Sequence, residues 1–363
     1  MAIVPKTIID ILRKIQLPGS RENIVDLNMA QEIRIAGSRI SFSLVFQQDN
    51  DPNIPLVINT CKTEIQKELG NAYEVTITPK SVQRMEPPAL PGVKNIIAIA
   101  SGKGGVGKST IAVNLAIALA NSGAKVGLID ADIFGPSIPK MFGVEDVKPN
   151  FEKVEGRDRI VPIEKYGVKI LSIGFFVDQA NALIWRGPMA SNALKQLIND
   201  GLWGELDYML IDLPPGTSDI HLTLVQTLAV TGSVIVTTPQ DVALADVIRG
   251  VAMFSSESIK VPILGIIENM AWFTPEELPG KKYYIFGKDG GKNLSEKMNI
   301  PFLGQIPIVM GIREGGDDGL PVAWKKNNST YQAFKDLAIN VIQQLERKDE
   351  LGKPAQKVKI KRK

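Results

Sequence analysis

The stretch SGKGGVGKST, residues 101–110, has the residue types and spacing that bind nucleotide phosphates. Residues 102–109 fit the pattern G-x-x-x-x-G-K-[ST], in which glycines let backbone N–H groups turn toward phosphate oxygens. We expect Lys108 to reach the β- and γ-phosphates and the Ser109 hydroxyl to bind Mg²⁺. Thr110 can bond a phosphate from the first turn of the following helix. The predicted ATP-binding residues here are Gly102, Lys103, Gly104, Gly105, Val106, Gly107, Lys108, Ser109 and Thr110.

Lys103 is an extra lysine in a loop that needs only one. Because it follows the first glycine directly, its side chain is expected to leave its own loop and reach a nucleotide on a second subunit. There it would offset the charge that develops on the phosphate, as an arginine finger does in trans. This predicts a homodimer with ATP between the two copies, in which Lys103 and Lys108 are both catalytic. A solvated loop lysine is the alternative.

Three aspartates come at the ends of apolar runs that predict buried strands. Carboxylates at the carboxyl ends of parallel strands face the ligand crevice of an open sheet. We expect Asp132 to be catalytic, orienting or deprotonating the attacking water, and Asp130 and Asp212 to join Ser109 at the metal. The turn at residues 214–216 is then placed to sense the γ-phosphate. The alternatives are a helix N-cap for Asp132 and a turn carboxylate for Asp212.

Asn269 ends the apolar run VPILGIIENM. Its side-chain amide can pair with the edge of an adenine base. We therefore add Asn269 to the predicted ATP site, with an ordinary strand-end turn as the alternative.

The elements that position these residues predict an α/β fold. From residue 96 onward, continuous apolar runs alternate with helical segments, and such runs are typical of strands buried on both faces. This rhythm predicts βαβ units and a doubly wound, mostly parallel sheet. The runs are NIIAIAS, AKVGLIDAD, DYMLIDLPPG, GSVIVTTPQ and VPILGIIENM. We expect this P-loop ATPase domain to span residues 96–348.

A small α+β domain is predicted over residues 1–80. Its pattern is a helix, a hairpin around Gly37, a second helix and a strand that stops at Pro79. Residues 81–95 are rich in proline and predict a linker. The basic end, residues 349–363, predicts a disordered tail that aids solubility, with weak contact to nucleic acid or an acidic partner as the alternative.

Composition narrows the function classes. The net charge of +3 gives little support to nucleic-acid binding. No apolar stretch reaches the roughly 18 residues of a membrane span. The chain has one cysteine, Cys61, which favours a reducing compartment and predicts a cytoplasmic protein.

The motifs SGKGGVGKST, DADIFGPSIP, WRGPM, DYMLIDLPPGTSD and ENM, in this order, closely resemble the Mrp/ApbC family of P-loop ATPases. These are described as iron–sulfur cluster carriers of the deviant Walker A group, alongside MinD and ParA. The resemblance covers residues 95–345, and residues 1–80 resemble a MIP18-like domain. It implies ATP-dependent transfer of clusters to apoproteins, with Lys103 acting across the dimer, residues 185–189 near the dimer interface, and iron–sulfur assembly proteins as further partners.

The chain departs from this family at the expected cluster ligands. Family carriers place a C-x-x-C pair after the ENM strand, whereas AWFTPEELPGKKYYIFG, residues 271–287, holds neither Cys nor His. Thr274 and Glu277 stand near the missing ligands, but hard oxygen groups are poor substitutes for thiolates. Cys61 is expected to be a buried structural thiol, with pairing across a dimer as the alternative. Two further hypotheses therefore remain, a nucleotide-gated scaffold for client proteins without metal and a positioning ATPase similar to ParA or MinD.

Overall fold

The computed structural model describes residues 4–18, 20, 22–46, 51–81, 89–132, 135–176, 187–217, 219–256, 259–278, 280–326 and 329–350. It divides the chain into two compact units, Met1–Pro87 and Pro88–Lys363. Residues 82–88 of the predicted linker, residues 351–363 of the predicted tail, and Trp185 and Arg186 of the WRGPM motif lie outside the described residues.

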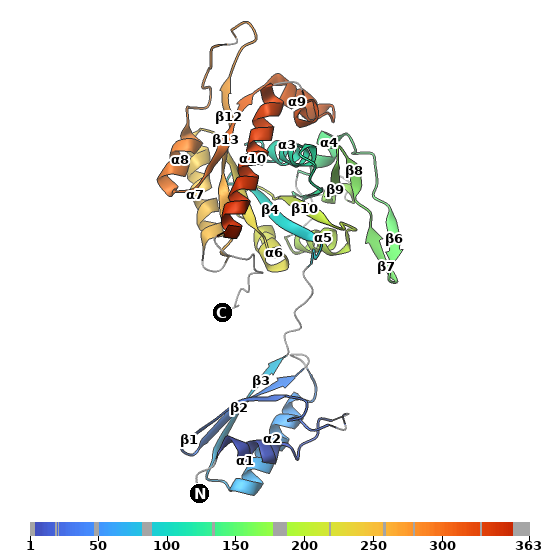
Figure 1. Cartoon of the computed structure of the whole chain (residues 1–363), viewed down its shortest axis with the longest axis vertical. Helices are drawn as coiled ribbons and strands as arrows, with labels where there is room; N and C mark the ends of the chain where they lie inside the picture. The colour runs from blue at the N-terminus through green and yellow to red at the C-terminus, as the bar shows by residue number, and fades with distance from the viewer. Residues whose placement is uncertain are drawn as a thin grey trace. The chain divides into compact units, whose positions relative to one another are not determined.

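The first unit is a three-stranded sheet with two helices (Figure 1). The predicted hairpin is confirmed, since β1 and β2 pair antiparallel on either side of Gly37. The third strand pairs parallel to β2, so the sheet order is β1-β2-β3. The elements are α1 (Pro5–Leu12), β1 (Ala30–Ala36), β2 (Arg39–Phe46), α2 (Ile54–Leu69) and β3 (Glu74–Ser81).

The expectation that Pro79 ends its strand is wrong. Strand β3 continues to Ser81, and Pro79 pairs with Leu44 of β2. Because β3 is an edge strand, it can accommodate a residue that lacks an N–H group.

The second unit is built on a central sheet, and the predicted doubly wound α/β fold is confirmed (Figure 1). The strand order among the described residues is β13-β12-β11-β4-β10-β5-β9-β8, and all neighbours are parallel except β8 and β9. A separate hairpin pairs β6 with β7. The strands are β4 (Val93–Ser101), β5 (Val126–Asp130), β6 (Phe151–Val154), β7 (Arg157–Ile160), β8 (Ile163–Lys165), β9 (Val168–Ser172), β10 (Leu206–Asp212), β11 (Gly232–Thr237), β12 (Ile263–Phe273) and β13 (Phe302–Ile308).

Two layers of helices cover the sheet because side chains alternate along each buried strand. In β4, Ile97 and Ile99 join the apolar core that includes α3 and α10, whereas Ala98 and Ala100 join the core on the other face. That second layer holds α5, α6, α7 and α8. The helices are α3 (Lys108–Asn121), α4 (Ile138–Phe142), α5 (Gly187–Asp200), α6 (Asp219–Thr227), α7 (Asp241–Ser255), α8 (Gly290–Met298), α9 (Met310–Asp317) and α10 (Ser329–Glu350), with short 3₁₀ turns at Ile173–Phe175 and Val322–Trp324.

The parallel sheet brings the motifs to one edge. The phosphate loop follows β4, Asp130 and Asp212 end the neighbouring strands β5 and β10, and Asn269 lies in β12. The carboxyl ends of parallel strands meet at the same edge, so these residues from distant parts of the chain lie around one crevice. Among the described helices, none is both long enough and apolar enough for a membrane crossing.

Candidate nucleotide-binding site

The phosphate loop runs from the end of β4 at Ser101 to the start of α3 at Lys108. Gly105 and Gly107 both have φ of +81°, a left-handed conformation that favours glycine. Gly102 lies against α7 so closely that an added Cβ would overlap the backbone of Asp246. Glycine is therefore required at positions 105 and 107 by the backbone conformation and at position 102 by close packing.

Substitution of Gly107 tests whether the loop requires glycine. An added Cβ would overlap the side-chain amide of Asn269, in addition to the strain of its positive φ. We expect Gly107→Ala to weaken ATP binding by at least about tenfold, which corresponds to about 1.4 kcal/mol. Titration with a fluorescent ATP analogue measures the affinity.

Gly123 provides the matched control for this substitution. Its φ is +93°, but an added Cβ would meet nothing within 4 Å. Gly123→Ala should therefore retain ATP affinity at a modest cost in stability. Equal ATP affinity for Gly107→Ala and the unaltered chain would contradict the expected clash.

Lys108 lies between two of the predicted aspartates. Its side chain is only 6% exposed, and Nζ is 2.7 Å from Oδ1 of Asp212 and 3.8 Å from Oδ2 of Asp132. Ser109 Oγ donates a hydrogen bond of 2.5 Å to the second oxygen of Asp212. The first residues of α3 are thus joined to the end of β10 through one carboxylate.

Asp130 is fully buried, and its carboxylate accepts hydrogen bonds from neighbouring groups. One oxygen accepts from the backbone N–H of Asp132 at 3.1 Å, and the other accepts from Ser172 Oγ at 2.9 Å and Ile138 N at 3.4 Å. These bonds fix the segment that carries Asp132.

Burial also changes the acidity of this group of carboxylates. Burial, together with the nearby carboxylate of Asp212, raises the pKa of Asp130 to about 7. Burial likewise raises the pKa of Asp212, against the opposing influence of Lys108. The Lys108 ammonium favours the ionised forms of both carboxylates, so it lowers their pKa values against the effect of burial.

The turn after β10 lies directly against the phosphate loop. The N–H of Gly216 donates to the carbonyl of Ser101 at 2.9 Å, and Leu213 N donates to Ile99 O at 3.1 Å. Pro215 lies close to Gly104, and both residues line the same cavity.

A cavity of about 210 Å³ lies where these elements meet. Lys103 is exposed and lines this cavity, and within the described part of the chain it forms no ion pair. Asp130 and Asp212 lie behind the cavity wall. The lining residues are Ser101, Lys103, Gly104, Gly105, Gly107, Lys108, Ser109, Thr110, Asp132, Ser137, Met141 and Pro215.

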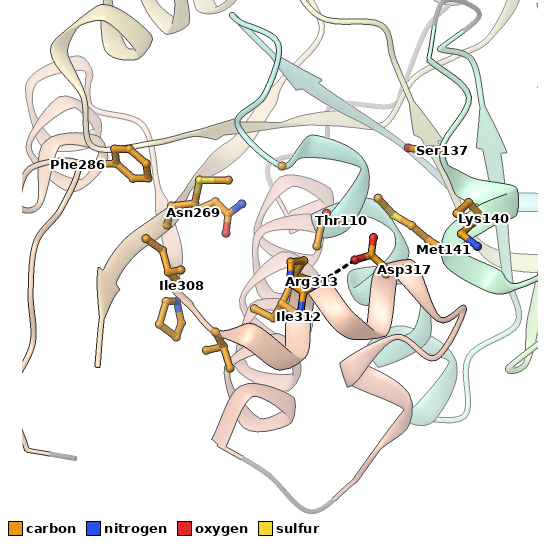
Figure 2. A pocket seen from close by; sticks show the side chains of 15 residues that line it. Thr110, Ser137, Lys140, Met141, Asn269, Phe286, Ile308, Ile312, Arg313 and Asp317 are labelled. Atoms are coloured by element: carbon orange, nitrogen blue, oxygen red, sulfur yellow. Dashed lines mark hydrogen bonds and ion pairs between the residues drawn. The ribbon is translucent and has the colours of Figure 1, made fainter. Parts of the chain in front are cut away.

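A larger cavity of about 580 Å³ adjoins the first and shares Gly107, Thr110, Ser137 and Met141 with it. In Figure 2, Asn269 and Phe286 lie on one side and Met141 on the other. The Asn269 amide nitrogen donates to the carbonyl of Val106 at 2.9 Å. The lining residues are Gly107, Thr110, Ser137, Lys140, Met141, Asn269, Met270, Phe286, Pro307, Ile308, Val309, Ile312, Arg313, Gly316 and Asp317.

Sequence reasoning missed most of this second cavity. Residues 307–309 lie at the carboxyl end of β13 and directly after it, and the apolar pattern did not predict this strand. The strand-end rule that selected Asp130 and Asp212 would have selected them too, had β13 been predicted. Arg313 and Asp317 come from α9 and form an ion pair of 3.1 Å (Figure 2), which no short motif signals.

The family follows from comparison with known proteins. The family model for ParA, described as NUBPL iron-transfer P-loop NTPase, matches residues 92–342. The chain belongs to this family. The predicted resemblance to the cluster-carrier ATPases is thereby confirmed.

Several relatives of this NUBPL-type chain are named as carriers or transfer proteins for iron–sulfur clusters. It is 42% identical over 319 residues to the iron-sulfur cluster carrier protein of Synechocystis, covering 87% of this chain and 90% of the relative. It is 47% identical over 259 residues to the iron-sulfur cluster transfer protein NUBPL of Dictyostelium discoideum, covering 71% and 79%. A nucleotide-binding protein of Archaeoglobus fulgidus, solved in complex with ADP, is 37% identical with a TM-score of 0.57, covering 68% and 94%.

In this NUBPL-type chain the segment after β12 forms a hairpin instead of a thiolate site. Phe273 and Tyr283 exchange two backbone hydrogen bonds of 2.8 Å, which closes the loop that holds Thr274 and Glu277. Across the described residues, no group of three or more His, Cys, Asp or Glu side chains could hold a metal ion.

Cys61 offers no replacement for the missing cysteines. It belongs to the buried face of α2 in the first unit, with Val57 and Ile65 one turn away on either side, and is 0% exposed. Burial raises the pKa of its thiol to about 12, so the thiolate that binds metal is strongly disfavoured. This supports the prediction of a structural thiol.

Proposed function

We propose that this NUBPL-type chain binds Mg-ATP, hydrolyses it as a homodimer, and uses this cycle in the transfer of iron–sulfur clusters to apoproteins. The observation that carries the proposal is the phosphate cavity, where Lys103, Lys108, Ser109 and Asp132 surround about 210 Å³. These groups suit phosphoryl transfer, in which the protein mainly positions the reactants and offsets charge.

Ser109 and Asp212 are the proposed holders of Mg²⁺. Their side chains are hydrogen-bonded to one another, with Ser109 lining the cavity and Asp212 directly behind its wall, and oxygen donors of this kind suit the ion. Two protein ligands are sufficient, because Mg²⁺ usually keeps waters and takes phosphate oxygens as well. Bound there, it would neutralise charge on the β- and γ-phosphates.

Asp132 is the proposed partner of the attacking water. Its side chain is 14% exposed and lines the phosphate cavity, unlike the fully buried Asp130 and Asp212. The backbone of Asp132 is fixed by its hydrogen bond to Asp130. Asp130 then acts as a positioning residue for Asp132.

Asn269 supports a preference for adenine. One of its two amide N–H groups donates to the carbonyl of Val106, which orients the side chain, and the amide oxygen can accept from a base in the larger cavity. An acceptor suits the exocyclic amino group of adenine, whereas guanine carries a carbonyl oxygen at the corresponding position. We therefore propose ATP over GTP.

The cargo assignment comes from the family, with an iron–sulfur cluster as the transferred substrate. Relatives are named carriers and transfer proteins for such clusters. The single buried cysteine also suits a reducing compartment, and we propose the cytoplasm.

A nucleotide-gated scaffold is the second candidate. It would gather a cluster donor and an apoprotein client without holding the cluster itself. The observation in its favour is specific, because the hairpin after β12 carries no thiol and Cys61 is buried.

Anaerobic reconstitution tests the proposal and separates the two candidates. The full chain is incubated with ferrous iron, sulfide and reductant, with and without Mg-ATP, and bound iron and visible absorbance are measured. Activation of an apoprotein that needs a [4Fe–4S] cluster is then followed with a separate cluster donor present.

A carrier should bind iron and sulfide and then activate the apoprotein by itself. A scaffold should bind none, yet speed activation from the donor when ATP is present. Lys108→Ala is the control that removes the nucleotide response, and Cys61→Ala tests whether any bound iron depends on the only thiol. If neither bound cluster nor ATP-dependent activation is found, the proposed function is wrong.

A further inference from the structure

Glu268 lies next to Asn269 in β12, yet it is completely buried, with 0% of its surface exposed. Successive side chains of a strand point to opposite faces, so Asn269 meets the phosphate loop while Glu268 points to the other face of the sheet. There Oε2 of Glu268 accepts a hydrogen bond of 2.5 Å from the backbone N–H of Gly291 in α8. Within the described part of the chain, no lysine or arginine forms an ion pair with this carboxylate. Hydrogen bonds from neutral groups therefore offset the cost of burying it.

The second oxygen of Glu268 is bonded across the sheet. Gln305 lies opposite Glu268 in the β12–β13 pair, and its amide nitrogen donates to Oε1 at 2.7 Å. The same nitrogen donates to Oδ1 of Asp289 at 2.9 Å. Because Asp289 directly precedes α8, the two N–H groups of one amide connect β13 both to Glu268 and to the start of that helix.

Two glycines allow α8 to begin this close to Glu268. An added Cβ at Gly291 would lie 3.1 Å from Oε2 of Glu268 and 3.2 Å from the side chain of Thr237. An added Cβ at Gly290 would overlap the carbonyl oxygen of Pro239. The carboxylate thus meets the amino end of a closely packed helix, where a negative charge is favoured.

These contacts join the three segments that form one side of the larger cavity. Strand β12 contributes Asn269, the turn before α8 contributes Phe286, and the end of β13 contributes Ile308. Figure 2 shows the three side chains together on that side. Each segment is connected directly to Glu268 or to its partner Gln305.

We propose that Glu268 is a positioning residue for the nucleotide base. This inference rests on the proposed function, in which the larger cavity takes the adenine ring. Glu268 points away from the phosphate loop and acts through its neighbours: it fixes the three segments against one another, so that Asn269 meets the base in one arrangement. The residues that line the phosphate cavity come from other segments. Glu268 should therefore affect the binding of the base and not that of the phosphates.

Replacing Glu268 with glutamine tests this role in the full chain. One of the two acceptor oxygens becomes an amide nitrogen, so either Gly291 or Gln305 is left facing a donor. We expect Glu268→Gln to bind ATP about tenfold more weakly, the size of effect expected for one unmatched buried donor. Its affinity for inorganic tripolyphosphate, which has phosphates and no base, should be unchanged. Competition against a fluorescent ATP analogue in the presence of Mg²⁺ measures both dissociation constants.

Gln305→Met removes the other partner of the contact at nearly the same side-chain length, and it should repeat the loss of ATP affinity. Asp207→Asn is the matched control. Asp207 also joins separate strands, because it accepts from Lys94 Nζ at 2.7 Å and from the backbone N–H of Lys125 at 2.9 Å. It lies at the start of β10, at the edge of the sheet opposite the nucleotide site. Asp207→Asn should lower the thermal stability and leave both affinities unchanged.

Two outcomes would overturn the positioning role and leave the proposed function intact. One is unchanged ATP affinity in both Glu268→Gln and Gln305→Met. The other is an equal loss of affinity for ATP and for tripolyphosphate, which would mean that Glu268 only supports the fold. If the unaltered chain binds ATP no more tightly than tripolyphosphate, the proposed base site and the role of Glu268 are both wrong.

Discussion

Replacing Lys103 with alanine is expected to lower the rate of ATP hydrolysis by about a thousandfold while largely retaining ATP binding. Lys103 lines the phosphate cavity but is exposed, whereas Lys108 is buried against Asp212 in the same subunit. Binding should therefore depend on Lys108 and hydrolysis on both lysines. Steady-state hydrolysis and titration with a fluorescent ATP analogue measure the two effects separately.

Mixing two inactive variants tests whether Lys103 acts across the dimer. Lys103→Ala retains the loop that binds ATP, and Lys108→Ala retains the lysine that a partner can supply. A mixed dimer has one site that holds both lysines, so hydrolysis should recover on mixing. Lys153→Ala, at an exposed position of β6, is the control and should hydrolyse ATP normally.

Two outcomes would contradict this assignment. Normal hydrolysis by Lys103→Ala would return Lys103 to a solvated loop lysine. A failure to recover activity on mixing, with mixed dimers present, would mean that Lys103 acts within its own subunit.

Replacing Asp132 with asparagine is expected to slow hydrolysis by about a hundredfold to a ten-thousandfold, the usual range for loss of a general base. Asparagine has nearly the same shape, and the backbone N–H of residue 132 can still donate to Asp130. The negative charge beside Lys108 and the capacity to accept a proton are lost. Single-turnover hydrolysis with excess enzyme measures the chemical step without product release.

The same variant should accumulate as an ATP-bound dimer. If hydrolysis releases the dimer, a chain that binds ATP and cannot cleave it stays closed, which size-exclusion chromatography with light scattering detects. Asp146→Asn makes the same chemical change at an exposed position and should behave as the unaltered chain. Unchanged single-turnover hydrolysis by Asp132→Asn would remove Asp132 from the mechanism.

In this member of the family the residues expected to bind nucleotide are present, whereas the thiolates expected to bind an iron–sulfur cluster are absent. The loop has its turns at Gly105 and Gly107, and Lys108 and Ser109 both donate hydrogen bonds to Asp212. The stretch after β12 has aromatic, acidic and basic side chains where thiolates are expected. The proposed ATP cycle therefore does not depend on whether the chain itself holds the cluster.

Local sequence patterns were sufficient to predict the phosphate loop and the central strands of the sheet. The turns of the loop depend on backbone freedom at Gly105 and Gly107, which is a property of the residues themselves. The continuous apolar runs of β4, β5, β10, β11 and β12 follow from burial on both faces, so each is visible without knowledge of its neighbours. The absence of a second cysteine is likewise a fact of the sequence alone.

Tertiary structure decided what depends on packing between distant segments. Asp130 ends β5 and Asp132 follows it closely, yet only the fold shows that Ser172 and Ile138 donate hydrogen bonds to Asp130 while Asp132 lines the cavity. The larger cavity combines residues 137–141 with residues 307–317, and no local pattern predicts that pairing. The sequence by itself determined that a nucleotide loop is present and that thiolate ligands are absent, because both depend on residue type. Which carboxylate faces the phosphates, and which side chains remain exposed beside them, depends on contacts that form only when the sheet brings its strand ends together.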